Sequence, residues 1–165
     1  MKTLAVACIF LAVAVTSCVA QSEAKQGGDH QSGVTRRGDQ AMGFSHEKTR
    51  HHFRLLNDGG AIEVNADDAN DTESRNQIRM HLEHISRMFA AGNFDIPMFI
   101  HATNPPGVAT MKELREQIHY RYQETDLGAL VRMQTSNQQA VKAIHEFLRF
   151  QISEHQTGDP ATVTE

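Results

Sequence analysis

Cysteine is almost missing from this chain: in 165 residues it occurs only as Cys8 and Cys18, close to the N-terminus. The remainder of the chain can therefore form no disulfide of its own, and thiolate cannot hold a metal ion there. Histidine, methionine and carboxylate side chains remain as metal ligands. Histidine is abundant, with 10 residues, whereas tryptophan is absent. The histidines are therefore the main candidates for functional residues.

Positive charge is also scarce. The formal net charge is −4 and the isoelectric point is near 6.2. Nucleic acids and anionic membranes both attract proteins with a basic surface, and the pair Arg36-Arg37 is too small to provide one. We therefore expect no nucleic-acid partner. A metal ion or another protein is the expected kind of partner.

An apolar run long enough to span a membrane is missing too, and the run from Leu4 to Val15 fits the apolar part of a secretory signal peptide. Residues 1–20 are predicted to be that signal, so we expect a periplasmic or secreted protein. Two ways of processing stay open. Cleavage after Ala20 gives a free chain, whereas Val15-Thr16-Ser17-Cys18 resembles a bacterial lipobox. A lipid on Cys18 would be the only membrane contact, and it would make the protein an envelope lipoprotein.

Residues 21–49 are rich in glycine, serine, glutamine and charge, without a regular apolar pattern. This composition is typical of a flexible tether. Met42 and Phe44 are exceptions, and Phe44 is expected to anchor the end of the tether to the folded domain. That domain is predicted over residues 50–158, followed by a tail over residues 159–165.

The domain begins with a predicted β-hairpin. His51, Phe53 and Leu55 alternate with more polar positions, Asn57 to Gly60 suit a tight turn, and Ile62 and Val64 return toward the core. Further elements are predicted as a helix from Asp71 or Thr72 to Ala91, an edge strand or packed loop over 94–101, a helix from Thr110 to Glu124, a strand from Ala129 to Gln134, and a closing helix over the stretch from Asn137 to Gly158, with Ser136 and Gln139 as a capping box at its start. The order ββααβα indicates an α+β fold, a small antiparallel sheet with helices on one face.

The second predicted element carries the strongest candidate for a metal site. His81 and His84 are three residues apart on one helix face, and Met88 follows one turn later. A histidine from another element, His51 or His101, could complete the site. Histidine with methionine suits copper, and histidine with a carboxylate suits zinc. The alternative is a metal-free interaction or structural module in which these histidines border the core.

The closing helix places two histidines, His145 and His155, beside its apolar stripe of Val141, Ile144 and Leu148. A histidine buried on that face should favour its neutral form, so its pKa should lie below the reference value of about 6.5. His145-Glu146 also begins like a zinc-protease motif, but Arg149 stands where the second histidine belongs. No hydrolase or phosphate-binding motif is present either. Binding is therefore expected rather than catalysis, with a metal-bound water as the open route to enzyme activity.

Five short motifs are spread along the chain beyond the predicted leader: Met42-Gly43-Phe44, Lys48-Thr49, His51-His52-Phe53, Pro105-Pro106-Gly107-Val108 and His155-Gln156-Thr157-Gly158-Asp159. Together they resemble a family of small exported bacterial proteins. The resemblance covers nearly the whole chain after its leader and implies bacterial export. It implies no activity.

Overall fold

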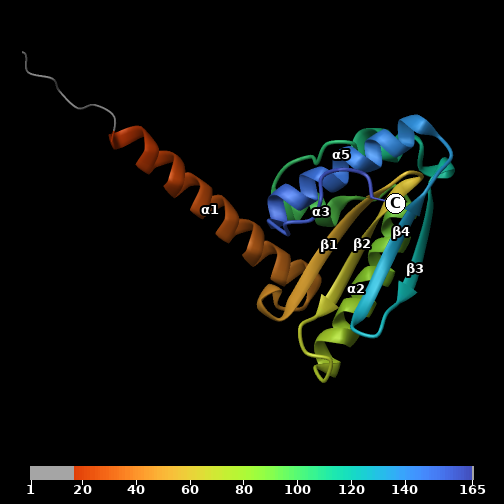
Figure 1. The fold of residues 1–165 in the computed structure, drawn as a ribbon, viewed down its shortest axis with the longest axis horizontal. Helices are drawn as coiled ribbons and strands as arrows, with labels where there is room; N and C mark the ends of the chain where they lie inside the picture. The colour runs from red at the N-terminus through yellow and green to blue at the C-terminus, as the bar shows by residue number, and fades with distance from the viewer. Residues whose placement is uncertain (1–16, 165) are drawn as a thin grey trace, which may run out of the picture.

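The computed structural model describes the backbone of residues 17–164 and the side chains of residues 28–164 (Figure 1). The predicted signal peptide falls mostly on residues 1–16, which lie outside this range. The elements are α1 (Ser17–Met42), β1 (Thr49–Leu56), β2 (Gly59–Ala66), α2 (Thr72–Ala90), α3 (Asp95–His101), α4 (Val108–Glu113), β3 (His119–Glu124), β4 (Gly128–Gln134) and α5 (Gln138–His155). Two short 3-10 turns lie at His46–Lys48 and Arg115–Gln117. Among the described residues, no helix combines the length and apolar character that crossing a membrane requires.

The four strands form one antiparallel sheet in the order β1-β2-β4-β3. Helices α2 and α5 pack against the face of this sheet that carries Phe53, Val64 and Val131, all of them buried (Figure 1). The α+β class, with helices on one face of a small antiparallel sheet, is confirmed. The order of elements after α1 is ββαααββα, which replaces the predicted ββααβα.

The first hairpin is confirmed, with Ile62 and Val64 directed into the core. Its turn consists of Asn57 and Asp58, and Gly59 takes the positive φ of 138° at the start of β2. The strand predicted at Ala129 to Gln134 is β4. The N-terminal cap of α2 is also confirmed, because the carboxylate of Asp71 accepts a hydrogen bond from the backbone N–H of Ser74.

The helix predicted from Thr110 to Glu124 is wrong. Helix α4 ends at Glu113, and residues 119–124 form the edge strand β3. Ile118 is buried, and Tyr120 and Tyr122 pack against the core at a spacing of two residues. Ile118 and Tyr122 are also four residues apart, which made the same side chains compatible with a helix.

The edge strand or loop predicted at 94–101 is also wrong, because α3 occupies residues Asp95–His101. Pro97 is the third residue of α3 and lies in the first turn of the helix. A proline is tolerated there because the backbone N–H groups of the first turn have no carbonyl partner within the helix. The ends of α5 differ as well. Asn137, rather than Ser136, caps its N-terminus through Oδ1, and the helix ends at His155 because Gln156 adopts a left-handed φ of 50°.

The segment expected to be a flexible tether is helical as far as Met42. Val34, Gly38 and Met42 follow one another at intervals of four and are buried along one side of α1. Because the middle residue of this stripe is Gly38, the apolar periodicity of the sequence does not indicate a helix here. Phe44 is only 4% exposed, so its predicted role as an anchor is confirmed.

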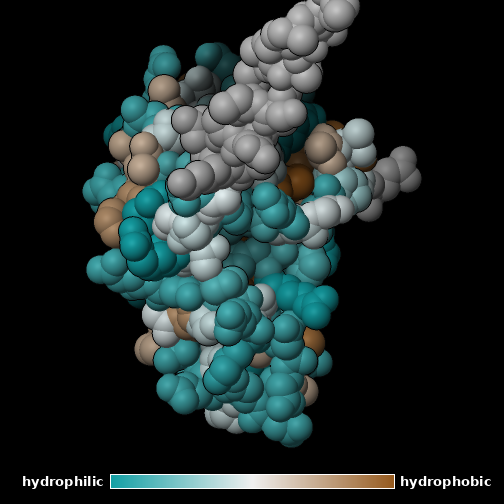
Figure 2. Space-filling model, turned by 90° about the vertical axis from the view of Figure 1, so that its left-hand side faces the viewer, coloured by the Kyte–Doolittle hydropathy of each residue, from teal (hydrophilic) through white to brown (hydrophobic). Residues whose placement is uncertain are grey.

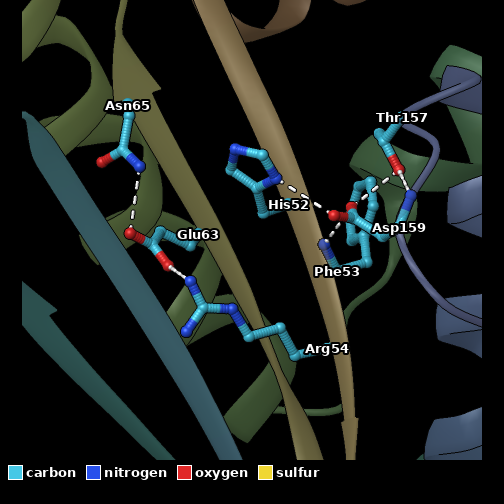
Figure 3. Close-up of polar contacts among 7 residues, drawn as sticks. All are labelled: His52, Phe53, Arg54, Glu63, Asn65, Thr157 and Asp159. Carbon is cyan, nitrogen blue, oxygen red and sulfur yellow. Dashed lines mark hydrogen bonds and ion pairs between the residues drawn. The ribbon is translucent and has the colours of Figure 1, made fainter. Parts of the chain in front are cut away.

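The C-terminal tail covers the open edge of β1. The carboxylate of Asp159 accepts hydrogen bonds from the backbone N–H of Phe53, the hydroxyl of Thr157 and Nδ1 of His52, as Figure 3 shows. Further along, the backbone N–H of Thr164 donates to the carbonyl of Leu55 at 2.9 Å. These bonds use the backbone groups that an edge strand would otherwise leave open.

Gly107 lies against the backbone of α5 and leaves no room there for a side chain. Its φ is 80°, and a Cβ atom there would lie 2.0 Å from the carbonyl oxygen of Ala143 in α5. We expect Gly107→Ala to lower the free energy of unfolding by about 3 kcal/mol or more, through left-handed strain and this clash. Gly158→Ala is the matched control, because φ is 76° and no atom lies within 4 Å of the added Cβ.

Urea denaturation of both variants tests this packing. Gly158→Ala should lose only about 1 kcal/mol, the cost of the left-handed conformation. Equal losses in the two variants would show that α4 does not press against α5 as described.

Candidate functional site

Four histidines from four different elements meet at one small cavity, which we call the histidine cavity. It has a volume of about 50 Å³ and lies between the sheet and helices α1, α2, α3 and α5. His51 enters from β1, His81 from α2, His101 from α3 and His155 from α5. Apart from Gln151, the other residues that line it are apolar: Met42, Phe53, Ile62, Leu82, Ile85, Phe89, Ile96, Pro97, Ile100 and Phe147.

The folding of each element explains why these histidines point inward. His51 shares the inward face of β1 with Phe53 and Leu55, because alternate strand residues face the same side. His81 lies next to the buried stripe of α2, beside Leu82. His101 and His155 are the last residues of α3 and α5, so both helices end at the cavity.

Three of the four imidazole rings are in contact with one another. The rings of His51 and His155 are stacked, with centroids 5.3 Å apart and an interplanar angle of 11°. The ring of His101 meets that of His155 edge-on at 5.0 Å. Phe44 packs against both His51 and His81, with centroid distances of 6.1 Å and 5.6 Å. One aromatic side chain therefore holds the strand histidine and the α2 histidine together.

Burial strongly favours the neutral form of these rings. Loss of solvation lowers the pKa of His51 and of His81 to about 4, and that of His155 to about 3, with smaller contributions from the neighbouring histidines. Burial also lowers the pKa of His101, against the opposing influence of Gln151 and Glu154. At neutral pH, all four imidazoles are therefore uncharged and have a free lone pair. For His155, the low pKa agrees with the expectation for its helix face.

Three of these rings lack hydrogen-bond partners within the described part of the chain. No protein atom there bonds a ring nitrogen of His51, His81 or His155, and desolvation and charge alone determine their pKa values. His101 differs, because its Nε2 lies 3.0 Å from Oε1 of Gln151 and its Nδ1 lies 3.3 Å from the carboxylate of Glu154. These three side chains are only partly buried, whereas Nδ1 of His101 and Nε2 of Gln151 are buried in the same cavity without a hydrogen-bond partner.

Three helices end at the histidine cavity. Among the described side chains, no Lys, Arg, Asp or Glu lines it. The last residue of α1 is Met42, that of α3 is His101 and that of α5 is His155. All three side chains line the histidine cavity. The C-terminal end of a helix carries the negative end of its dipole and stabilises a nearby positive charge.

A second, larger cavity adjoins the first. It has a volume of about 360 Å³ and shares Met42, His51 and His155 with the histidine cavity. Its other walls come from α1, the start of β1 and the residues after α5. We call it the outer cavity. Two histidines at its border already have carboxylate partners, since His46 pairs with Asp39 and His52 with Asp159 (Figure 3).

The structure brings together only part of the predicted metal site. His51, His81 and His101 line one cavity, whereas the side chain of His84 is exposed and Met88 is half-buried against the core. His155 and Met42 were not predicted as ligands. Among the side chains of residues 28–164, no three of histidine, aspartate, glutamate or cysteine stand in positions from which they could hold one metal ion. The rings meet face to face and edge to face rather than with their lone pairs converging.

His145 has a different environment, although it shares the helix of His155. It is buried, and its Nε2 lies 2.9 Å from the carbonyl oxygens of both Leu56 and Gly59. A ring N–H there joins α5 to both ends of the hairpin turn. His145 is thus a structural histidine.

Comparisons of the chain with family models, with curated proteins and with solved structures give no match. The group formed by His51, His81 and His155, with His101 and Met42 beside it, is therefore the basis on which a function can be inferred.

Proposed function

We propose that this protein is an exported metal-binding protein that holds one copper(I) ion in the histidine cavity, through His51, His81 and His155. The observation that carries the proposal is the set of three neutral imidazoles without hydrogen-bond partners among the described residues, all facing one cavity. Neutral imidazole is the form that binds metal. Ring nitrogens that make no hydrogen bond within the described residues are available to a ligand.

The charge of the cavity favours copper(I) over zinc(II). Among the described side chains, no carboxylate lines the cavity, so the proposed ligands would not neutralise the charge of the ion. The cost of burying an ion grows with the square of its charge, which makes a dication about four times as costly as a monocation. The thioether of Met42, at the wall of both cavities, is a soft ligand of the kind that selects copper(I).

Binding of the ion requires the rings to rotate. His51 and His155 are nearly parallel, and lone pairs in parallel stacked rings cannot point at the same ion. Rotation about their side-chain bonds would turn both rings toward one centre in the histidine cavity, which has a volume of about 50 Å³. His101 is held by Gln151 and Glu154, so it would support the ring of His155 rather than bind the ion.

The alternative is a metal-free interaction or structural module. The close stacking of His51 on His155 favours it, because stacked aromatic rings contribute packing energy without any ligand. The two functions differ in what they require of the ring nitrogens. Only copper binding needs the lone pairs.

Equilibrium dialysis against copper(I) with a competing chelator, followed by metal analysis, tests the proposal. We expect one ion per chain, and His81→Ala should bind copper at least about tenfold more weakly. The matched control is His84→Ala, on the same helix three residues away but exposed to solvent, and it should bind like the unmodified protein. Equal effects of the two substitutions, or no bound copper in the unmodified protein, would contradict the proposal.

A further inference from the structure

Helix α1 forms one wall of both cavities. Met42 lines the histidine cavity and the outer cavity, and Gln31, Val34, Thr35 and Gly38 complete the wall of the outer one. His51 and His155 also line both cavities. The described part of α1 therefore borders the space onto which these histidines open.

Side-chain contacts with α3 and α5 fasten this wall to the domain. Val34 and Met42 are buried beneath it, Nε of Arg37 donates to the carbonyl of Ile100 at 2.7 Å, and Nε2 of His30 lies 2.8 Å from the carboxylate of Glu154. The surface on this side of the molecule is mainly hydrophilic where it is described, as Figure 2 shows. Release of α1 would thus expose a short apolar stripe rather than a broad core face.

A hinge lies directly after the helix. Gly43 has a φ of 79°, and a Cβ atom at this position would meet no atom within 4 Å. Phe44, the next residue, is buried and anchored between His51 and His81. The chain therefore passes from the helix to a firmly held side chain through one residue of high backbone freedom, and the contact between Asp39 and His46 bridges this residue.

We infer that α1 is a movable cover that pivots at Gly43 and controls access of solutes to His51 and His155. The hydrogen bond from Arg37 to α3 and the contact of His30 with α5 hold the cover closed. This inference deepens the proposed function, because the cover would regulate entry and release of the copper(I) ion. The opening itself takes place whether or not a metal is bound.

Modification of the histidines by diethyl pyrocarbonate tests the cover without any metal. The full chain, treated with a copper chelator, is exposed to the reagent, and the rate at each histidine is measured by peptide mass spectrometry. Exposed His84 serves as the internal reference. Arg37→Ala should raise the rates at His51 and His155 by about tenfold relative to His84, because it removes a charged hydrogen bond that only the closed state makes.

Arg36→Ala is the matched control, since Arg36 is the neighbouring residue and its side chain is exposed. It should leave the rates unchanged. Gly43→Ala is a second variant, because left-handed strain in the closed state should raise both rates about fivefold. Equal rates at His51 and His155 in the unmodified protein and in Arg37→Ala and Gly43→Ala would overturn the cover.

Copper transfer provides the second readout. In Arg37→Ala, transfer of copper(I) to an added chelator should be about tenfold faster than in Arg36→Ala, with unchanged stoichiometry. Faster histidine modification without any copper binding would support the cover and contradict the copper proposal. Copper binding with unchanged modification and transfer rates would support the copper proposal and contradict the cover.

Discussion

Acidification of the metal-free protein from about pH 7.5 to about pH 5 is expected to lower its free energy of unfolding by about 6 kcal/mol. The pKa values of His51 and His81 are lowered to about 4, and that of His155 to about 3. In the unfolded chain, the same side chains titrate near 6.5. Each histidine thus contributes about 2 kcal/mol to the loss at pH 5. The whole stability of a small domain is commonly about 5–15 kcal/mol.

The sign follows from which state takes up protons first. Above about pH 6.5, both states hold neutral imidazoles, and the stability is complete. As the pH falls below that value, the unfolded chain is protonated while the folded chain is not, until the pH reaches the folded pKa values near 4 and 3. Glu154 and Asp159 have lowered pKa values, so their contributions are lost only below about pH 4.5. The interval from pH 6.5 to 5 therefore isolates the histidines.

Urea midpoints at the two pH values, in the presence of a copper chelator, measure this loss. His155→Gln should lose about 2 kcal/mol less than the unmodified protein on acidification, because one titrating group is gone. His84→Gln, at an exposed position of α2, should lose as much as the unmodified protein. An equal loss in all three proteins would show that His155 is not held in its neutral form by burial.

The hairpin could be predicted from the sequence because its signals are local. Alternating residues in β1, a glycine after the turn and two apolar residues in β2 all lie within one short segment. Helix α1 and strand β3 were not predictable in the same way. The face of α1 contains Gly38, and the residues of β3 fit two periods equally well. Only contacts with distant elements decide such cases.

The site shows the same limit at the scale of single side chains. His51, His81 and His101 were identified as candidate ligands, whereas His84 and Met88 were grouped with them on spacing alone. Phe44 determines which edge of α2 is covered, because it packs against His81. Phe44 belongs to a segment more than 30 residues earlier in the chain. His155 was assigned to the core because it follows the apolar stripe of α5. Its position as the last residue of that helix, beside His51, depends on the docking of α5 against β1.

Replacement of both stacked histidines by leucine should separate binding from stability. In His51→Leu with His155→Leu, two of the three proposed ligands are removed, and we expect copper(I) affinity to fall by about 1,000-fold or more, which equals about 4 kcal/mol. The same variant should be more stable than the unmodified protein by about 1–2 kcal/mol at pH 7.5. Leucine is more apolar than imidazole and fits the mainly apolar lining of the cavity.

The single variant His145→Leu makes the same chemical change at a histidine that does have partners. It removes the contacts of Nε2 with the carbonyl oxygens of Leu56 and Gly59, so it should lower the free energy of unfolding by about 1–3 kcal/mol and leave copper affinity unchanged. Urea denaturation and copper competition on both variants measure the contrast. If the double variant is destabilised as His145→Leu is, the stacked rings contribute to the fold itself, and the metal-free alternative gains the support that copper binding loses. Opposite signs in the two variants are expected, because His145 has hydrogen-bond partners that leucine would leave unsatisfied, whereas His51 and His155 have none among the described residues.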